Sequence, residues 1–149
     1  MVLLSRLLAG ALPLALLLAA GSAVAAEGIG QIKTAKGQVS VDRGGRALSV
    51  QVGMPLAAAD VVRTGADGYA GITMRDDSLL SIGPNSVLAL ERFDFDPTTH
   101  QGRFDSRLER GTLAVVSGRL ARQSPEAMTL RTPAAVLGVR GTEFAVAVP

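Results

Sequence analysis

Residues 38–55, QVSVDRGGRALSVQVGMP, decide the fold class of this chain. Val39 and Val41 alternate with polar residues, and the same period of two returns after the Gly44-Gly45 pair at Leu48, Val50 and Val52. Such alternation is typical of a β-strand with one buried face, and paired glycines favour a tight turn between two strands. We therefore predict two short strands joined by a turn, with a second turn where the segment ends.

The same alternation continues to the end of the chain. Apolar residues separated by one polar residue occur at Phe93 and Phe95 and again at Met128 and Leu130. Residues that favour turns interrupt the alternation at spacings of about ten residues. These turn positions are 43–45, 53–55, 65–68, 83–85, 96–97, 102, 111, 118 and 124–125. Short helical turns fit only at 57–59 and 120–122, so residues 27–149 are predicted to form one all-β domain.

Three all-β architectures share this pattern: the sandwich, the barrel and the solenoid. The short strands and the similar spacing of the turns favour a short β-helix, a solenoid-like stack in which each coil lies on the previous one. Residues 64–72, 79–90 and 108–116 could each be one coil. No strict repeat is present, so a β-sandwich remains the alternative.

The first 26 residues have the pattern of a secretory signal peptide. Arg6 gives a positively charged start, Leu7 to Ala20 is apolar, and Ala23-Val24-Ala25 fits the cleavage pattern of small residues. Because a membrane-spanning helix needs about 20 apolar residues, we favour cleavage over an uncleaved anchor. A periplasmic or secreted protein is expected, with no stable membrane insertion once the signal peptide is removed.

The composition argues against several kinds of chemistry. The 149 residues contain no cysteine and one histidine, His100, which excludes disulfides and thiolate ligands and disfavours histidine metal sites. The formal net charge is only +2, and acidic residues interleave with the arginines at 103–122, so nucleic-acid binding is not expected. A triad of Ser86 or Ser117 with His100 would lack the G-x-S-x-G motif. We predict no catalytic residue, no cofactor and no metal.

Three stretches stand out by their residue types. They are DVVRTG (60–65) with DDSLLSIGPNS (76–86), LERGTL (108–113) and RTPAAVLGVRGTEF (131–144). In this order and spacing they resemble the FecR domain, a periplasmic module of iron-transport regulators that also occurs alone in exported bacterial proteins. The resemblance runs from about Gly37 to Val148 and is most specific at 132–144.

The resemblance implies a β-helical fold and a non-enzymatic interaction module in envelope sensing or signalling, with a weaker link to iron uptake. Its implied partner is an unidentified envelope protein. The family's usual Asp-Gly-Ser is Asp76-Asp77-Ser78 here, and aspartate tolerates left-handed turn geometry better than most residues. A module that binds cell-wall polymers or glycans is the alternative function, which the scarcity of aromatic residues weakens.

The possible interaction motif is Arg140-Gly141-Thr142-Glu143-Phe144. A guanidinium and a carboxylate make a directional recognition pair, but the same residues could serve the fold instead. In this structural interpretation, which we favour, Gly141 forms a tight turn and Phe144 fills the core. Arg140 and Glu143 would then pair with each other or with an aspartate at 76 or 77. We therefore predict that Phe144 is buried.

The last run of the chain, FAVAV at 144–148, is apolar at every position and carries no charge. At the end of a stack its backbone N–H and C=O groups would be unpaired, which makes it a template for another strand. Val146 and Val148 therefore mark a candidate edge strand. We expect one of three covers: the segment 27–35 folding back, a strand of a partner protein, or a second copy of the chain.

Overall fold

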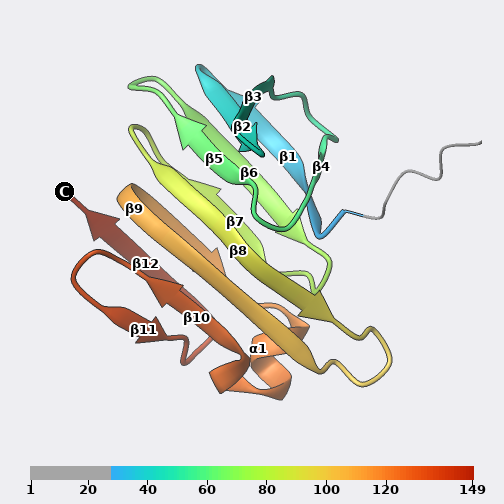
Figure 1. Ribbon diagram of the computed structural model, residues 1–149. Helices are drawn as coiled ribbons and strands as arrows, with labels where there is room; N and C mark the ends of the chain where they lie inside the picture. Colours follow the sequence, from blue (N-terminus) through green and yellow to red (C-terminus); the bar gives the residue numbers. More distant parts are fainter. Residues whose placement is uncertain (1–27) are drawn as a thin grey trace, which may run out of the picture.

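The computed structural model of the protein describes residues 28–149. They form one curled sheet of twelve strands, with one short α-helix and one 3₁₀ turn (Figure 1). The predicted signal peptide, residues 1–26, lies outside the described residues. No helix within residues 28–149 has the length and apolar character needed to cross a membrane.

The strands are β1 (Gly30–Lys36), β2 (Val39–Arg43), β3 (Arg46–Ser49), β4 (Pro55–Leu56), β5 (Val61–Thr64), β6 (Tyr69–Met74), β7 (Leu79–Ile82), β8 (Val87–Phe95), β9 (Gly102–Val116), β10 (Met128–Arg131), β11 (Val136–Gly138) and β12 (Glu143–Val148). The helix α1 spans Arg119–Gln123, and the 3₁₀ turn η1 spans Pro125–Ala127. Their order along the chain agrees with the predicted alternation of short strands and turns.

The sheet has two halves that share β9. Half-sheet A contains β4, β1, β6, β7, β9 and β12 in that order. Half-sheet B contains β3, β2, β5, β8, β9, β10 and β11. The first part of β9 pairs with β8 and β10, and its last part pairs with β7 and β12. This one strand therefore holds the two halves together, and Figure 1 shows it running across the molecule.

Gly111 marks the place where β9 passes from one half-sheet to the other. Its φ of +94° lies in the region that favours glycine, and a Cβ at this position would collide with the side chain of Ser86. The N–H of Thr112 donates to the Ser86 hydroxyl at 3.0 Å, which ties the segment between β7 and β8 to the bend. The sequence predicted a turn at Gly111, whereas the structure shows a bend inside one strand of fifteen residues.

The core lies between the two half-sheets. Its largest fully buried side chains alternate with exposed residues along the strands, as the period of two predicts. They are Ile32, Leu56, Ile72, Met74, Leu80, Ile82, Leu88, Leu90, Phe104, Leu108, Leu113 and Leu120. Phe93 meets Phe104 edge to face, with 5.3 Å between ring centroids, an arrangement that aromatic rings favour. The helix α1 adds Leu120 and Ala121 to this core.

The all-β class is confirmed, but a β-helix is not. A β-helix stacks successive coils in the same direction, whereas neighbouring strands here are antiparallel in every pair except β9 and β10. The reason is local: tight turns such as those at Gly44-Gly45 and 96–101 reverse the chain, so consecutive strands form hairpins. The result is a curled half-barrel.

Two finer expectations need correction. The predicted strand through Leu48, Val50 and Val52 ends at Ser49, and the side chain of Val52 is 66% exposed. The segment 27–35 was expected to fold back onto the end of the chain, but its residues from 30 onwards belong to β1, which pairs with β6 and β4, and residue 27 lies outside the described residues. One of the three covers expected for the last strand is therefore wrong.

Candidate interaction surface

The strand β12 forms one edge of half-sheet A. It pairs with β9 in antiparallel register, from Glu143 opposite Val116 to Val148 opposite Gly111. Within residues 28–149, no strand pairs with the other side of β12. Figure 1 shows β12 along the outer side of β9, with the chain end beyond it. Val146 and Val148, the residues of the candidate edge strand, lie in β12.

The hydrogen-bond pattern shows which backbone groups of β12 face away from β9. The N–H of Ser117 donates to the carbonyl of Thr142 at 2.7 Å, so these two residues form a hydrogen-bonded pair of the ladder. In an antiparallel ladder such pairs alternate with pairs that exchange no hydrogen bonds. The backbone groups of Phe144 and Val146 therefore point towards β9. The N–H and C=O groups of Ala145 and Ala147, and those of Glu143, point outwards.

The side chains of β12 alternate in the same way. Phe144, Val146 and Val148 face inwards and pack against the core, but each remains only partly buried. Phe144 was predicted to be buried; its ring does pack against the core but is only partly buried, because no strand flanks β12 on its open side to cover it. Ala145 and Ala147 face outwards and are exposed. An added strand would therefore complete both the hydrogen bonds and the apolar packing of β12.

The opposite end of the sheet is protected against such an addition. There, half-sheet A ends in β4, which has only two residues and begins with Pro55. Half-sheet B ends in β3, which begins with the exposed Arg46. Very short strands, prolines and charges are the devices that natural proteins use to block edge-to-edge pairing. From Phe144 to Val148, β12 has none of these devices. The edge at β12 is therefore open to an added strand, whereas the edges at β4 and β3 are protected.

The structure places the motif residues before β12 on the surface. Arg140, Gly141, Thr142 and Glu143 are exposed, and Gly141 has a φ of +98°, as a tight turn requires. The hydroxyl of Ser117 donates to the Gly141 carbonyl at 3.2 Å and holds this turn against β9. Among residues 28–149, neither Arg140 nor Glu143 forms an ion pair. The guanidinium and the carboxylate are therefore open to solvent beside the edge strand.

Asp76 and Asp77 have other partners. Asp76 is fully buried, and its carboxylate accepts from the N–H of Ser78 at 3.1 Å, the Ser78 hydroxyl at 2.8 Å and the N–H of Leu120 at 3.3 Å. Asp77 has a φ of +68°, the left-handed geometry expected where the family has glycine, and it forms an ion pair with Arg119 at 3.0 Å. Asp76 thus joins the β6–β7 hairpin to the start of α1. Sequence reasoning missed this role because the two contact segments lie 44 residues apart.

Hydrogen bonds hold two carboxylates near the β8–β9 loop, Asp105 in β9 and Asp96 directly after β8. Burial raises the pKa of the Asp105 carboxyl, but the hydrogen bonds from Arg103 at 2.8 Å and Thr129 at 2.6 Å lower it more. The pKa of Asp105 therefore lies below its ordinary value. Backbone N–H groups of Thr98 and Thr99 likewise hold the pKa of Asp96 below its usual range. These interactions stabilise the charged form of each carboxylate and give both residues a role in the fold.

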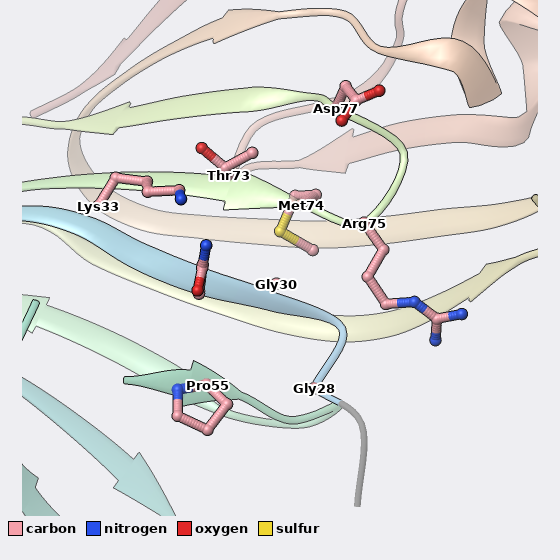
Figure 2. Close-up of a pocket in the computed structure, with 9 residues that line it drawn as sticks. Gly28, Gly30, Lys33, Pro55, Thr73, Met74, Arg75 and Asp77 are labelled. Carbon is pink, nitrogen blue, oxygen red and sulfur yellow. The ribbon is translucent and has the colours of Figure 1, made fainter. Parts of the chain in front are cut away.

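One charged hollow lies over β1, β4 and the end of β6. It has a volume of about 540 Å³, and its lining includes Lys33, Thr73, Arg75 and Asp77. Figure 2 shows Lys33 on β1, Thr73 on β6 and Arg75 at the turn after β6, with the Arg75 side chain pointing away from the other two. Catalysis needs a nucleophile, base or acid held in mutual reach. This hollow does not bring such a set together.

Three other kinds of site can be checked within residues 28–149: a metal site, a serine–histidine triad and a sugar-binding surface. No group of three His, Asp or Glu side chains there could hold a metal ion. The hydroxyls of Ser86 and Ser117 donate to backbone carbonyls and not to His100. The His100 ring stacks on Phe95, with 5.9 Å between the ring centroids. Tyr69, at 37%, is the one exposed aromatic side chain of the described part of the chain. A platform for stacking a sugar ring would need more exposed aromatic side chains than this one.

Comparison with known proteins identifies the family. A family model described as FecR protein matches residues 60–148, more than half of the chain. The match begins at Asp60 and covers the strands from β5 to β12, including Asp76-Asp77-Ser78 and the exposed turn at Gly141. No curated protein and no solved structure matches the chain. On the strength of the family match, this chain belongs to the FecR protein family.

Proposed function

We propose that this domain is an exported, non-enzymatic interaction module in which β12 receives a strand from a partner protein of the bacterial envelope. The FecR family is a signalling and regulatory family, and a contact between proteins is the step through which such a domain would pass on a signal. Export to the periplasm, or secretion, rests on the predicted signal peptide at residues 1–26.

The open edge of β12 is the observation that carries the proposal. Its outward N–H and C=O groups can pair with an incoming strand, as in other cases of strand addition. The inward side chains Phe144 and Val146 are only partly buried, so an apolar residue of the partner would remove further apolar surface from water. Arg140 and Glu143 stand beside the edge and would select the charges that flank the partner's strand.

The partner's strand can be described by what β12 requires. Its inward positions must be apolar, because they would lie beside Phe144 and Val146. Its outward positions must be small or polar, because they would continue the exposed row of Ala145 and Ala147. Binding of a cell-wall glycan, the alternative that the sequence leaves open, has no comparable feature in its favour.

Photocrosslinking in the native cells tests the proposal. A photoreactive residue replaces Ala147, whose side chain is exposed on the edge strand, and a control carries it at Arg63 on the outer face of half-sheet B. We expect a product with a different protein from position 147 and none from position 63. The additional substitution Ala145→Pro removes an outward N–H without touching the ladder to β9 and should abolish the product. Ala145→Ser keeps that N–H and should preserve it.

Three results would contradict the proposal. The first is a product that survives Ala145→Pro, since the contact would then not need the backbone edge. The second is equal crosslinking from Arg63 and position 147. The third is a product that contains only the chain itself.

A further inference from the structure

We infer that β12 pairs with β12 of a second copy of this chain, in an antiparallel dimer with Ala145 on the two-fold axis. The inference rests on the proposed function, because the dimer would occupy the edge that the partner requires. It adds a form of regulation: the edge is covered until a partner strand replaces the second copy.

The strand that β12 requires as a neighbour has the properties of β12 itself. Its inward residues are Phe144, Val146 and Val148, which are apolar, and its outward residues between them are alanines. A second copy therefore supplies apolar groups to the partly buried side and small groups to the exposed side. Among the unpaired edges of residues 28–149, β3, β4 and β11 have only two to four residues, against six in β12.

The outward backbone groups fix the register of the dimer. Only pairs between Glu143, Ala145 and Ala147 can exchange hydrogen bonds, because the groups of the intervening residues are used by β9. Placing Ala145 opposite its own copy puts Glu143 opposite Ala147 on both sides of the axis. All three outward residues of each copy are then paired. A shift by two residues in one direction would place Glu143 opposite Pro149, which has no N–H. The same shift in the other direction would place Ala147 opposite Gly141, which lies in the turn before β12 and whose carbonyl already accepts from Ser117.

The side chains and charges agree with this register. Phe144 of one copy lies opposite Val146 of the other in a pair without hydrogen bonds, where side chains approach most closely. Aromatic and β-branched residues are favourable cross-strand partners in such positions. Glu143 faces Ala147 and not another carboxylate, so no like charges meet. A two-fold axis through Ala145 makes the contact closed, so it forms a dimer and not a filament.

An edge pairing of six residues buries less surface than a standard stable interface. The dimer should therefore dissociate on dilution, which is what a reversible cover requires. Sedimentation velocity of the purified exported chain over a dilution series measures this directly. We expect a shift from dimer to monomer as the concentration falls.

A matched pair of lysine variants tests the register. Ala145→Lys places two lysines opposite each other on the axis, and we expect a monomer at every concentration. Ala147→Lys makes the same change two residues further along the same exposed row, but it places each lysine opposite Glu143 of the other copy. We expect this variant to dimerise at least as well as the unaltered chain. Both positions are exposed, so circular dichroism should show that both variants fold.

A single cysteine gives a second readout, because the chain has none of its own. Opposed residues in a hydrogen-bonded antiparallel pair have Cα atoms about 5.5 Å apart, within disulfide range. Ala145→Cys should therefore form a disulfide-linked dimer under mild oxidation, and Ala147→Cys should form far less. A chain that is monomeric throughout the dilution series, or equal behaviour of the two lysine variants, would overturn the inference.

The outcomes separate the dimer from the proposed function. If the chain is monomeric but Ala147 still crosslinks to a different protein in cells, the dimer is wrong and the partner contact stands. If Ala145→Lys abolishes a dimer and no crosslink to another protein forms, the edge serves self-association and the proposed partner contact is wrong.

Discussion

Two neighbouring aspartates make the most informative pair of substitutions in this protein. Asp76 is fully buried and accepts three hydrogen bonds, whereas the side chain of Asp77 is 71% exposed and pairs only with Arg119. The same replacement by asparagine at each position changes charge but hardly changes size. We expect Asp76→Asn to destabilise the domain strongly and Asp77→Asn to have little effect.

The loss of unfolding free energy expected for Asp76→Asn follows from the contacts of Asp76. One carboxylate oxygen accepts from the Ser78 hydroxyl and the Leu120 N–H, and the other accepts from the Ser78 N–H. An asparagine keeps one acceptor oxygen, so at least one buried donor loses its partner at a cost of about 1–3 kcal/mol. The remaining hydrogen bonds change from charged to neutral, which costs about 1 kcal/mol each. The expected total is about 3–5 kcal/mol, a large part of the stability of an ordinary domain.

Asp77→Asn provides the control. Asparagine tolerates the positive φ of this position, and an exposed ion pair contributes about 0–1 kcal/mol. Urea unfolding followed by circular dichroism gives both free energies of unfolding. A difference of less than about 1 kcal/mol between the two variants would show that the Asp76 network does not hold α1 to the β6–β7 hairpin.

Three further predictions concern other parts of the sheet. Arg43→Ala removes the two hydrogen bonds that the half-exposed Arg43 donates to the buried Asp60 carboxylate. It should lower the free energy of unfolding by about 1.5–3 kcal/mol. The exposed pair of Arg63 with Asp42 should contribute about 1 kcal/mol at most by the same urea assay, and equal losses at the two arginines would contradict this. Because the folded pKa of Asp105 is lowered, its contribution is present above the unfolded pKa of about 3.9 and is lost as the pH falls through the folded value. Unfolding titrations should therefore show Asp105→Asn less stable than wild type at neutral pH, with a difference that closes in acid, and a difference independent of pH would refute it. Phe144→Ala should cost about 2 kcal/mol, below the 3–5 kcal/mol of a fully buried ring, and a loss in the higher range would show that the open side of the ring is covered in the isolated chain.

Much of the fold could be predicted from local pattern. The alternation at Val39 and Val41 and at Met128 and Leu130 identified β2 and β10. Turns were expected at 96–97 and at 102, and the structure has a loop over 96–101 between β8 and β9. These features depend on side chains within a few residues of one another. The class of the fold follows from them.

The architecture could not be predicted in the same way. Gly111 has the same local signature as the turn glycines, but contact with Ser86, 25 residues earlier, makes it a bend inside β9. The choice between a β-helix and a curled antiparallel sheet depends on such distant pairs. The sequence suggested the run at 144–148 as a candidate edge strand, because an uncharged apolar run is a local property. It did not reveal which backbone groups face outwards, because that depends on the register with β9.

Amide hydrogen exchange along β12 tests the account most directly. Single-residue exchange is measured at a concentration where the chain is monomeric, by NMR or by mass spectrometry with fragmentation. We predict slow exchange at Phe144 and Val146, whose N–H groups bind β9, and fast exchange at Ala145 and Ala147, whose N–H groups face outwards. Dimer formation or partner binding should then slow the exchange of the two alanines. Protection of all four amides in the monomer would contradict the account, because the edge of β12 would already be closed.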